Sequence, residues 1–198
     1  SLIMLGGGAA TDLVGAGTTQ RLTVNGVIRM TQSTLSPRLA VPVVEVSQVP
    51  NVDAIGAAGR GFIPDTAVYL GAAITAIPTN AGYKYNNIRL TTGGPVVVAS
   101  DTIQGQLHTT SSNAFFIGSV THRMGKLRTS GTGTLTINSV DHNLTVVDSV
   151  IFGGGSTNGT LTAGTMTVGG NFVQAGGNTA AFAATGTFNT ILNGTAPQ

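Results

Sequence analysis

Short motifs recur along this chain at intervals of about 20–26 residues, and this interval restricts the fold more than any other feature. The motif "IGSVTH" at 117–122 returns as "INSVDH" at 137–142, and "GTLT" at 133–136 returns unchanged at 159–162. Likewise "LTVVDSVIFGGG" at 144–155 returns as "MTVGGNFVQAGG" at 166–177, and "GTM" at 164–166 returns as "GTF" at 186–188. Several independent echoes in one range of spacing indicate a repeat architecture.

The segments that recur have the pattern of β-strands. Short alternating runs such as "RLTVNGVIRM" and "TLTIN" are bounded by Gly, Asn, Ser or Pro, and apolar residues at helical spacing are nearly missing. The interval is too short for a propeller blade of about 40 residues and too rich in strands for a helical repeat. We therefore predict an all-β chain that folds as a parallel β-helix (solenoid), with coils of about 20–26 residues stacked about 4.8 Å apart.

The two halves of the chain differ in regularity. Five of the seven prolines fall between positions 34 and 82, where no echo is found, and proline cannot donate to the ladder of a central strand. We expect 1–30 to form the first coil or coils, 31–91 to be irregular or laterally packed, and 92–198 to form a regular stack of about five coils. The prolines of this irregular N-terminal half belong at edges or corners.

Composition limits the partners. Only 8% of residues are charged, against roughly 25% in ordinary soluble domains, and the net charge is +2. Because the basic residues are scattered, we expect no nucleic-acid partner. The apolar opening "SLIMLGGGAA" is too short to span a membrane, so we predict no membrane span. Cysteine is absent, and since the chain starts at Ser we expect a processed product or an excerpt of a longer chain.

Two histidines in the doubled hexapeptide are the candidates for a metal site. One coil apart, His122 and His142 would lie about 5 Å from each other, close enough to share a metal. Asp141 and His108 are the neighbours that could complete the ligand set. The alternative is that both imidazoles fill equivalent positions of a ladder at a corner. We favour the ladder and predict no metal and no other cofactor.

The remaining letters of the hexapeptide fit the corner. Gly118 and Asn138 are equivalent, and these residue types most readily adopt the left-handed conformation of a sharp corner. Such a corner would break strict alternation, so that Ile117 and Val120 could both face the core. The spacing between the two hexapeptides then gives the length of a coil.

Catalytic and sugar-binding residues are sparse. β-Helix lyases and glycosidases use clustered carboxylates, and of the seven here only Asp141 and Asp148 are close in sequence. We therefore predict that the protein is not an enzyme, with a polysaccharide lyase or hydrolase as the alternative. Tyr83 and Tyr85 alternate around Lys84, so both rings point to one side. They could stack on a carbohydrate, but we favour packing against the stack or a neighbouring subunit.

The two ends of the chain offer a surface for assembly. Gln20 stands just before a predicted strand, and Gln198 stands in the matching place at the end of "LNGTAPQ", with its strand missing. The open end of a parallel stack exposes unpaired N–H and C=O groups, which template further pairing. The residues we predict at the assembly interface are Ser1, Leu2, Ile3, Gln20, Leu22, Val24, Ile191, Leu192, Asn193 and Gln198.

Three segments carry a resemblance to a known group of proteins. The segments "LTAGTMTVGGNFVQ", "GTTQRLTVNG" and "YNNIRLTTGG" resemble the Gly- and Thr-rich segments of bacterial surface and secreted β-solenoid proteins of the filamentous adhesin and autotransporter passenger type. The resemblance implies a right-handed β-helix outside the cell with an adhesive or fibre-forming role. We therefore expect an extracellular structural or adhesive protein whose copies stack strand to strand into a homo-polymer, as a fibre or surface layer. The alternative is a tailspike- or lyase-like β-helix that binds or cleaves polysaccharide, such as a cell-surface polysaccharide.

Overall fold

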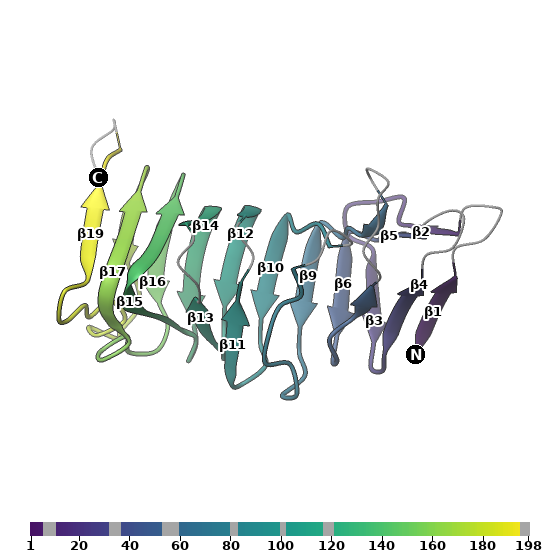
Figure 1. Ribbon diagram of the computed structural model, residues 1–198, viewed down its shortest axis with the longest axis horizontal. Helices are drawn as coiled ribbons and strands as arrows, with labels where there is room; N and C mark the ends of the chain where they lie inside the picture. The colour runs from purple at the N-terminus through teal and green to yellow at the C-terminus, as the bar shows by residue number, and fades with distance from the viewer. Residues whose placement is uncertain are drawn as a thin grey trace.

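The protein is a β-solenoid made of stacked parallel strands (Figure 1). The computed structural model describes residues 1–5, 11–31, 37–52, 60–79, 83–99, 102–116 and 121–194. Within these ranges every regular element is a strand, every pairing between strands is parallel, and no helix could span a membrane. The coils follow one another along a single long axis, with β1 at one end and β19 at the other. The predicted parallel β-helix is confirmed.

Each of the first three coils contributes three short strands. The first contains β1 (Leu2–Leu5), β2 (Asp12–Val14) and β3 (Arg21–Val24). The second contains β4 (Ile28–Thr31), β5 (Arg38–Ala40) and β6 (Val43–Val46), and the third β7 (Asn51–Val52), β8 (Gly61–Phe62) and β9 (Thr66–Tyr69). Corresponding strands pair as β1-β4-β7, β2-β5-β8 and β3-β6-β9, so the stack has three faces.

Later coils contain longer strands that round a corner. β14, for example, pairs with β15 through its first residues and with β16 through its last. The bounds are β10 (Asn87–Leu90), β11 (Pro95–Val98), β12 (Thr102–Thr109), β13 (Asn113–Phe116), β14 (Thr121–Ser130), β15 (Thr134–Val146), β16 (Val150–Gly153), β17 (Leu161–Val168), β18 (Phe172–Gln174) and β19 (Asn189–Leu192).

One face runs the length of the described stack, and we call it the long face. It consists of β3, β6 and β9 of the first three coils, β10 of the fourth coil, the ends of β12 and β14 in the fifth and sixth coils, and β16 and β18 of the seventh and eighth coils. Side chains alternate along each strand, so that in β10 Ile88 and Leu90 are buried and Arg89 points outward. Matching inward residues stack into columns, which merge into one apolar core along the axis.

The strand register shows which sequence echoes correspond to one turn of the stack. Met166 pairs with Thr190 and not with Phe188, and Leu161 pairs with Ile137 and not with Leu135, so the echoes of "GTM" and "GTLT" are out of register. Leu144 pairs with Met166 and Val150 with Phe172, which confirms that the echo of "LTVVDSVIF" is one turn of the stack. The interpretation of the hexapeptide was wrong, because His122 pairs with Leu144 and not with His142. The interval between the two hexapeptides is therefore shorter than the turn that contains them.

The length of a coil varies along the stack. The most widely separated partners in the sequence belong to the first two coils, where Leu2 pairs with Ile28. The least separated partners belong to the middle of the stack, where Val96 pairs with Ala114. The shortest coil is thus shorter than predicted, and the longest lies at the upper limit of the predicted range.

The described strands between residues 31 and 91 form part of the stack and do not pack beside it. β5, β6, β8, β9 and β10 all join the parallel ladders of the coils before and after them. The expectation of lateral packing is therefore corrected, although the strands here are short. Pro42 and Pro64 lie between strands and Pro95 opens β11, as expected for a residue that cannot donate to a ladder.

Candidate functional site

Both ends of the described solenoid expose residues that would be core in the middle of the stack. Leu13 pairs with Leu39, which is fully buried, yet Leu13 is 38% exposed. At the other end Leu192 pairs with the fully buried Val168 and is itself 52% exposed. Each of these side chains points inward but has a neighbouring coil on only one side. The apolar core therefore reaches solvent at both ends of the part that the structure describes.

The predicted interface residues divide between these two ends. Leu2 and Leu22 are half-buried and Val24 is buried, since their side chains pair with the core of the second coil. Ile3 is exposed on the outer surface, because the next residue, Met4, points inward. The exposed members are Ser1, Ile3 and Gln20 at one end and Ile191, Leu192 and Asn193 at the other, while Gln198 lies outside the described residues. The two groups can meet only between two molecules.

A lateral groove of about 570 Å³ lies at the corner where the second to fifth coils turn onto the long face. Its polar lining includes Asp65, Lys84, Asn86 and Gln104. The Asp65 carboxylate accepts hydrogen bonds from the side-chain amides of Asn86 and Asn87, which fix its orientation. Asp65 is the one carboxylate among the lining residues, whereas both common mechanisms of glycoside hydrolysis use two. The groove is built for hydrogen bonding more than for hydrolysis.

The two candidate sugar-binding tyrosines line this groove but are 7% exposed. Their rings stack on each other with centroids 6.1 Å apart. The Tyr83 hydroxyl donates to the Pro50 carbonyl, and the Tyr85 hydroxyl donates to the Pro78 carbonyl (3.0 Å). Burial raises the pKa of both phenols, which keeps them neutral. These rings therefore pack and anchor the proline corners, and they leave little ring surface for a sugar.

The histidines of the hexapeptide are core residues. His122 is 1% exposed, and its ring lies 4.9 Å from that of Phe116. His142 is also buried, and its Nδ1 has no hydrogen-bond partner; burial, with a smaller effect of His122, lowers the pKa of His142. Asp141 points to solvent. Across the described ranges no three His, Asp or Glu side chains are grouped to hold a metal ion.

The predicted left-handed corner does not form at Asn138. Its φ is not positive, and it lies inside β15, next to an irregularity in the register with β17. Positive φ occurs one coil later, at Gly164. Val140, the equivalent of Val120, is 71% exposed, so the pattern does not turn both apolar residues inward. Residues 117–120, which contain Ile117, Gly118 and Val120, lie outside the described residues.

The register of the long-face strands also places charged residues next to one another that are far apart in the sequence. One outward column of the long face contains Thr23, Glu45, Val68, Arg89, His108, Arg128, Ile151 and Val173. Arg89, His108 and Arg128 are neighbours in this column, although they are far apart along the chain. Their separation in the sequence is close to one coil, and this signal could have revealed the group.

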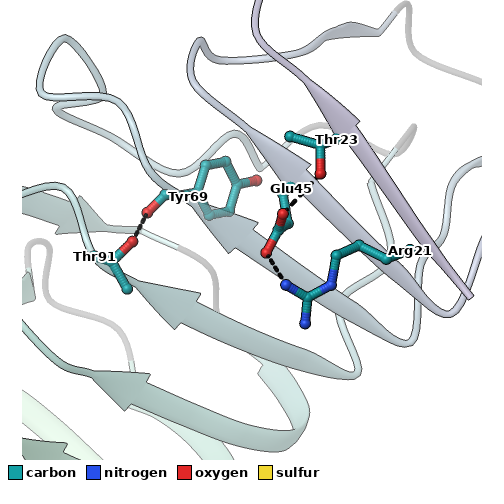
Figure 2. Close-up of polar contacts among 5 residues, drawn as sticks. All are labelled: Arg21, Thr23, Glu45, Tyr69 and Thr91. Carbon is teal, nitrogen blue, oxygen red and sulfur yellow. Dashed lines mark hydrogen bonds and ion pairs between the residues drawn. The ribbon is translucent and has the colours of Figure 1, made fainter. Parts of the chain in front are cut away.

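The charges in this column differ between its first coils and its middle. In the first two coils Glu45 accepts hydrogen bonds from the Arg21 guanidinium (2.7 Å) and from Thr23 (2.8 Å), as Figure 2 shows. In the same view Thr91 donates to the Tyr69 carbonyl (3.1 Å), which ties the fourth coil to the third. Further along, partial burial and the nearby charges of Arg128 and Arg89 lower the pKa of His108 to about 4. The negative charge of Glu45 is thus paired with Arg21, whereas Arg89 and Arg128 place positive charge on both sides of His108.

Comparison with known proteins adds no further constraint, because no protein-family model, no curated protein and no solved structure matches this chain.

Proposed function

We propose that this protein is an extracellular structural or adhesive subunit, or a segment of one, that stacks head to tail into a fibre or surface layer. The observation that carries this proposal is the open apolar core at both ends. Seven of the eleven exposed large apolar side chains in the described ranges lie in β1, β2, β18 or β19. Of these, Leu13 and Leu192 belong to the open core, whereas others, such as Ile3 and Val173, point outward beside it. Contiguous exposed apolar surface marks interaction sites, and the free edges of parallel strands are templates for pairing.

The strand order supports a second copy as the partner. β2 and β19 belong to the same face, and β3 and β18 both belong to the long face. A copy placed on the last coil would continue the ladder of β2 and β19, with Leu13 and Leu192 pointing into a shared core. Such a contact joins two different surfaces, so it repeats without closing and produces a filament.

The charge distribution favours close approach at the C-terminal end. Residues 149–198 contain no Asp, Glu, Lys, Arg or His. Natural edge strands are commonly protected by charged side chains that oppose pairing with other molecules, and this region has none. The resemblance of the Gly- and Thr-rich segments to filamentous adhesins supports the extracellular and adhesive parts of the proposal.

The assembly can be tested with one charge at either end. We expect the native chain to form filaments that lengthen with concentration, measured by sedimentation velocity and negative-stain microscopy. Leu13→Lys and Leu192→Lys should each abolish filaments, because a lysine would be buried without a partner. A mixture of the two variants retains one intact pair of ends, so it should stop at one-to-one dimers.

The control places the same charge on the side of the stack. Val140→Lys changes the most exposed large apolar residue of the described ranges, in a middle coil, and should leave the filaments intact. Native protein that remains monomeric at tens of micromolar would refute the assembly. Filaments lost equally with the control variant would refute the role of the ends.

Polysaccharide binding is a second candidate function, favoured by the lateral groove. Its amide, carboxylate and ammonium groups suit the hydroxyls of a sugar, and its single carboxylate favours binding over cleavage. Gln104→Ala should then weaken binding of a glycan without changing assembly. Release of reducing ends from a polysaccharide by the purified protein would instead support an enzyme.

A further inference from the structure

The long face presents a continuous polar surface across its fourth to sixth coils. The central column there is Arg89, His108 and Arg128, and we call these three residues the cationic stripe. Both arginines are exposed, and the imidazole of His108 is hydrogen-bonded to the Ser130 hydroxyl (2.8 Å). The stripe follows the axis, with backbones about 4.8 Å apart from one coil to the next.

The neighbouring columns add hydrogen-bonding groups, and the carboxylates that contact them are Asp65, which accepts a hydrogen bond from the Asn87 amide, and Asp148. On one side lie Asn87, Gln106 and Lys126, and on the other Thr91, Thr110 and Ser130. Lys126 is paired with Asp148 (3.2 Å). Within the described residues neither arginine of the stripe has an ion pair with a carboxylate. Two guanidinium groups are therefore available to an external anion.

From this arrangement we infer that the cationic stripe binds a linear acidic polysaccharide laid along the solenoid axis, with its carboxylate or sulfate groups on Arg89 and Arg128. Guanidinium groups pair with such oxyanions through two parallel hydrogen bonds. The Gln106 amide suits a sugar hydroxyl, and the Thr91 and Thr110 hydroxyls, which donate to backbone carbonyls, keep oxygens that can accept from one. The inference deepens the second candidate function, on which it rests, by naming the class of polysaccharide and a surface outside the groove.

The geometry favours a polysaccharide over a nucleic acid. The two guanidinium groups lie two coils, or about 9.6 Å, apart along the axis with the neutral His108 between them, which is close to the length that two sugar residues add to an extended chain. Duplex DNA carries one charge per roughly 1.7 Å, and specific binding uses on the order of 6–10 phosphate contacts, more than this stripe offers. Single-stranded nucleic acid is held by stacking on aromatic rings, and all the Phe and Tyr residues here are buried or half-buried.

His108 provides an internal reporter of the bound anion. The charged groups that face it are Arg89 on β10 and Arg128 on β14, the two strands packed against β12 on this face. Both keep the imidazole neutral at neutral pH. An anion held between the arginines would offset their field, so the pKa of His108 should rise above about 4 when the polymer binds. Binding should accordingly strengthen as the pH falls from 7 to 5.

Calorimetry with four polymers tests the inference: polygalacturonate (carboxylate), dextran sulfate (sulfate), neutral dextran and a single-stranded oligonucleotide. We expect one or both acidic polysaccharides to bind, with an affinity that falls as salt is raised. Arg89→Gln with Arg128→Gln should weaken that binding at least about tenfold. The matched control is Arg29→Gln with Arg123→Gln, which removes the same charge from exposed arginines outside the long face and should change affinity less than about twofold.

Proton NMR of the imidazole measures the pKa of His108, which general charge attraction elsewhere on the protein would not change. A rise in the pKa of His108 in the presence of the polysaccharide, absent in the stripe variant, would support binding at the stripe. Equal losses in the two double variants, an unchanged His108, or tighter binding of the oligonucleotide would each overturn the inference. Binding of neutral dextran that is lost in Gln104→Ala and kept in the stripe variant would overturn it too, and would leave the groove as the polysaccharide site.

Discussion

The first four coils and the later coils belong to one continuous stack but pass the corners in different ways. In the first half the strands are short, none longer than β3 or β6, and prolines stand between them. In the second half β12, β14, β15 and β17 continue around a corner, with glycines where backbones come close. A solenoid therefore specifies the pairing of its coils strictly, while the corners can be built from quite different residues.

The two kinds of corner are held by different interactions. In the first half, buried tyrosines link the coils, and the hydroxyls of Tyr83 and Tyr85 bind backbone carbonyls at the proline corners. In the second half, the buried Thr129 hydroxyl accepts hydrogen bonds from the backbones of Gly153 and Gly154 (both 3.2 Å). The first half should thus be sensitive to lost hydroxyls and the second to added volume.

The largest effect should come from adding one methyl group to a glycine corner. A Cβ on Gly154 would lie 2.1 Å from the carbonyl oxygen of Gly133 and 3.0 Å from the nitrogen of Ser130. Both neighbours are backbone atoms, so two coils would have to separate. We expect Gly154→Ala to lower the free energy of unfolding by about 3 kcal/mol, measured by urea denaturation.

Gly177→Ala is the control for this substitution. A Cβ there would meet nothing within 4 Å, and the φ of Gly177 is not positive. The change should be neutral or should stabilise by up to about 1 kcal/mol, because alanine restricts the unfolded chain. Equal destabilisation by the two substitutions would show that close packing of coils does not explain the glycine corners.

A smaller effect should follow from removing a hydroxyl in the first half. Tyr83→Phe removes the donor to the Pro50 carbonyl and the acceptor of the hydrogen bond from Val52 N (3.1 Å). Because these groups are buried, we expect a loss of about 2 kcal/mol in the free energy of unfolding. Thr23→Val removes an exposed hydroxyl and should cost only about 0.5 kcal/mol. Hydrogen exchange should place the Tyr83→Phe opening in the third and fourth coils.

The success of the sequence interpretation depended on whether a repeat preserved the length of its corner. The echo that pairs Leu144 with Met166 spans connections of equal length, 147–149 between β15 and β16 and 169–171 between β17 and β18, so its spacing equals the register. The hexapeptide gave a wrong register because the turn between its two copies is longer than their separation in the sequence. His122 therefore pairs with Leu144 and not with His142. Local similarity reveals a repeat, but only the lengths of the loops determine which residues become neighbours.

The candidate surfaces were predictable to different degrees. The open ends were predictable, because the last coil of any stack has a neighbouring coil on one side only, and Leu192 has no described coil beyond it. The cationic stripe was not predicted, because its basic residues are scattered along the sequence. Arg89 and Arg128 share a column only because each coil between them has nearly the same length. The groove could not be predicted, because loops of different length bring Asp65 and Gln104 together.

The two halves should also differ in how their stability depends on pH, with a smaller effect than that of Gly154→Ala or Tyr83→Phe. All three histidines lie at position 108 or later, and both His108 and His142 have a pKa below the ordinary value of 6.5. The unfolded chain therefore binds more protons than the folded chain between about pH 6.5 and 4, so stability falls as the pH falls through that range. Because His108 is partly exposed, we expect a loss on the order of 1 kcal/mol between pH 7 and 5.

Hydrogen exchange at the two pH values should place this loss in the second half alone. His108→Asn with His142→Gln should flatten the dependence, and a loss that persists in that double variant, or that appears equally in the first four coils, would mean that other groups cause the acid sensitivity.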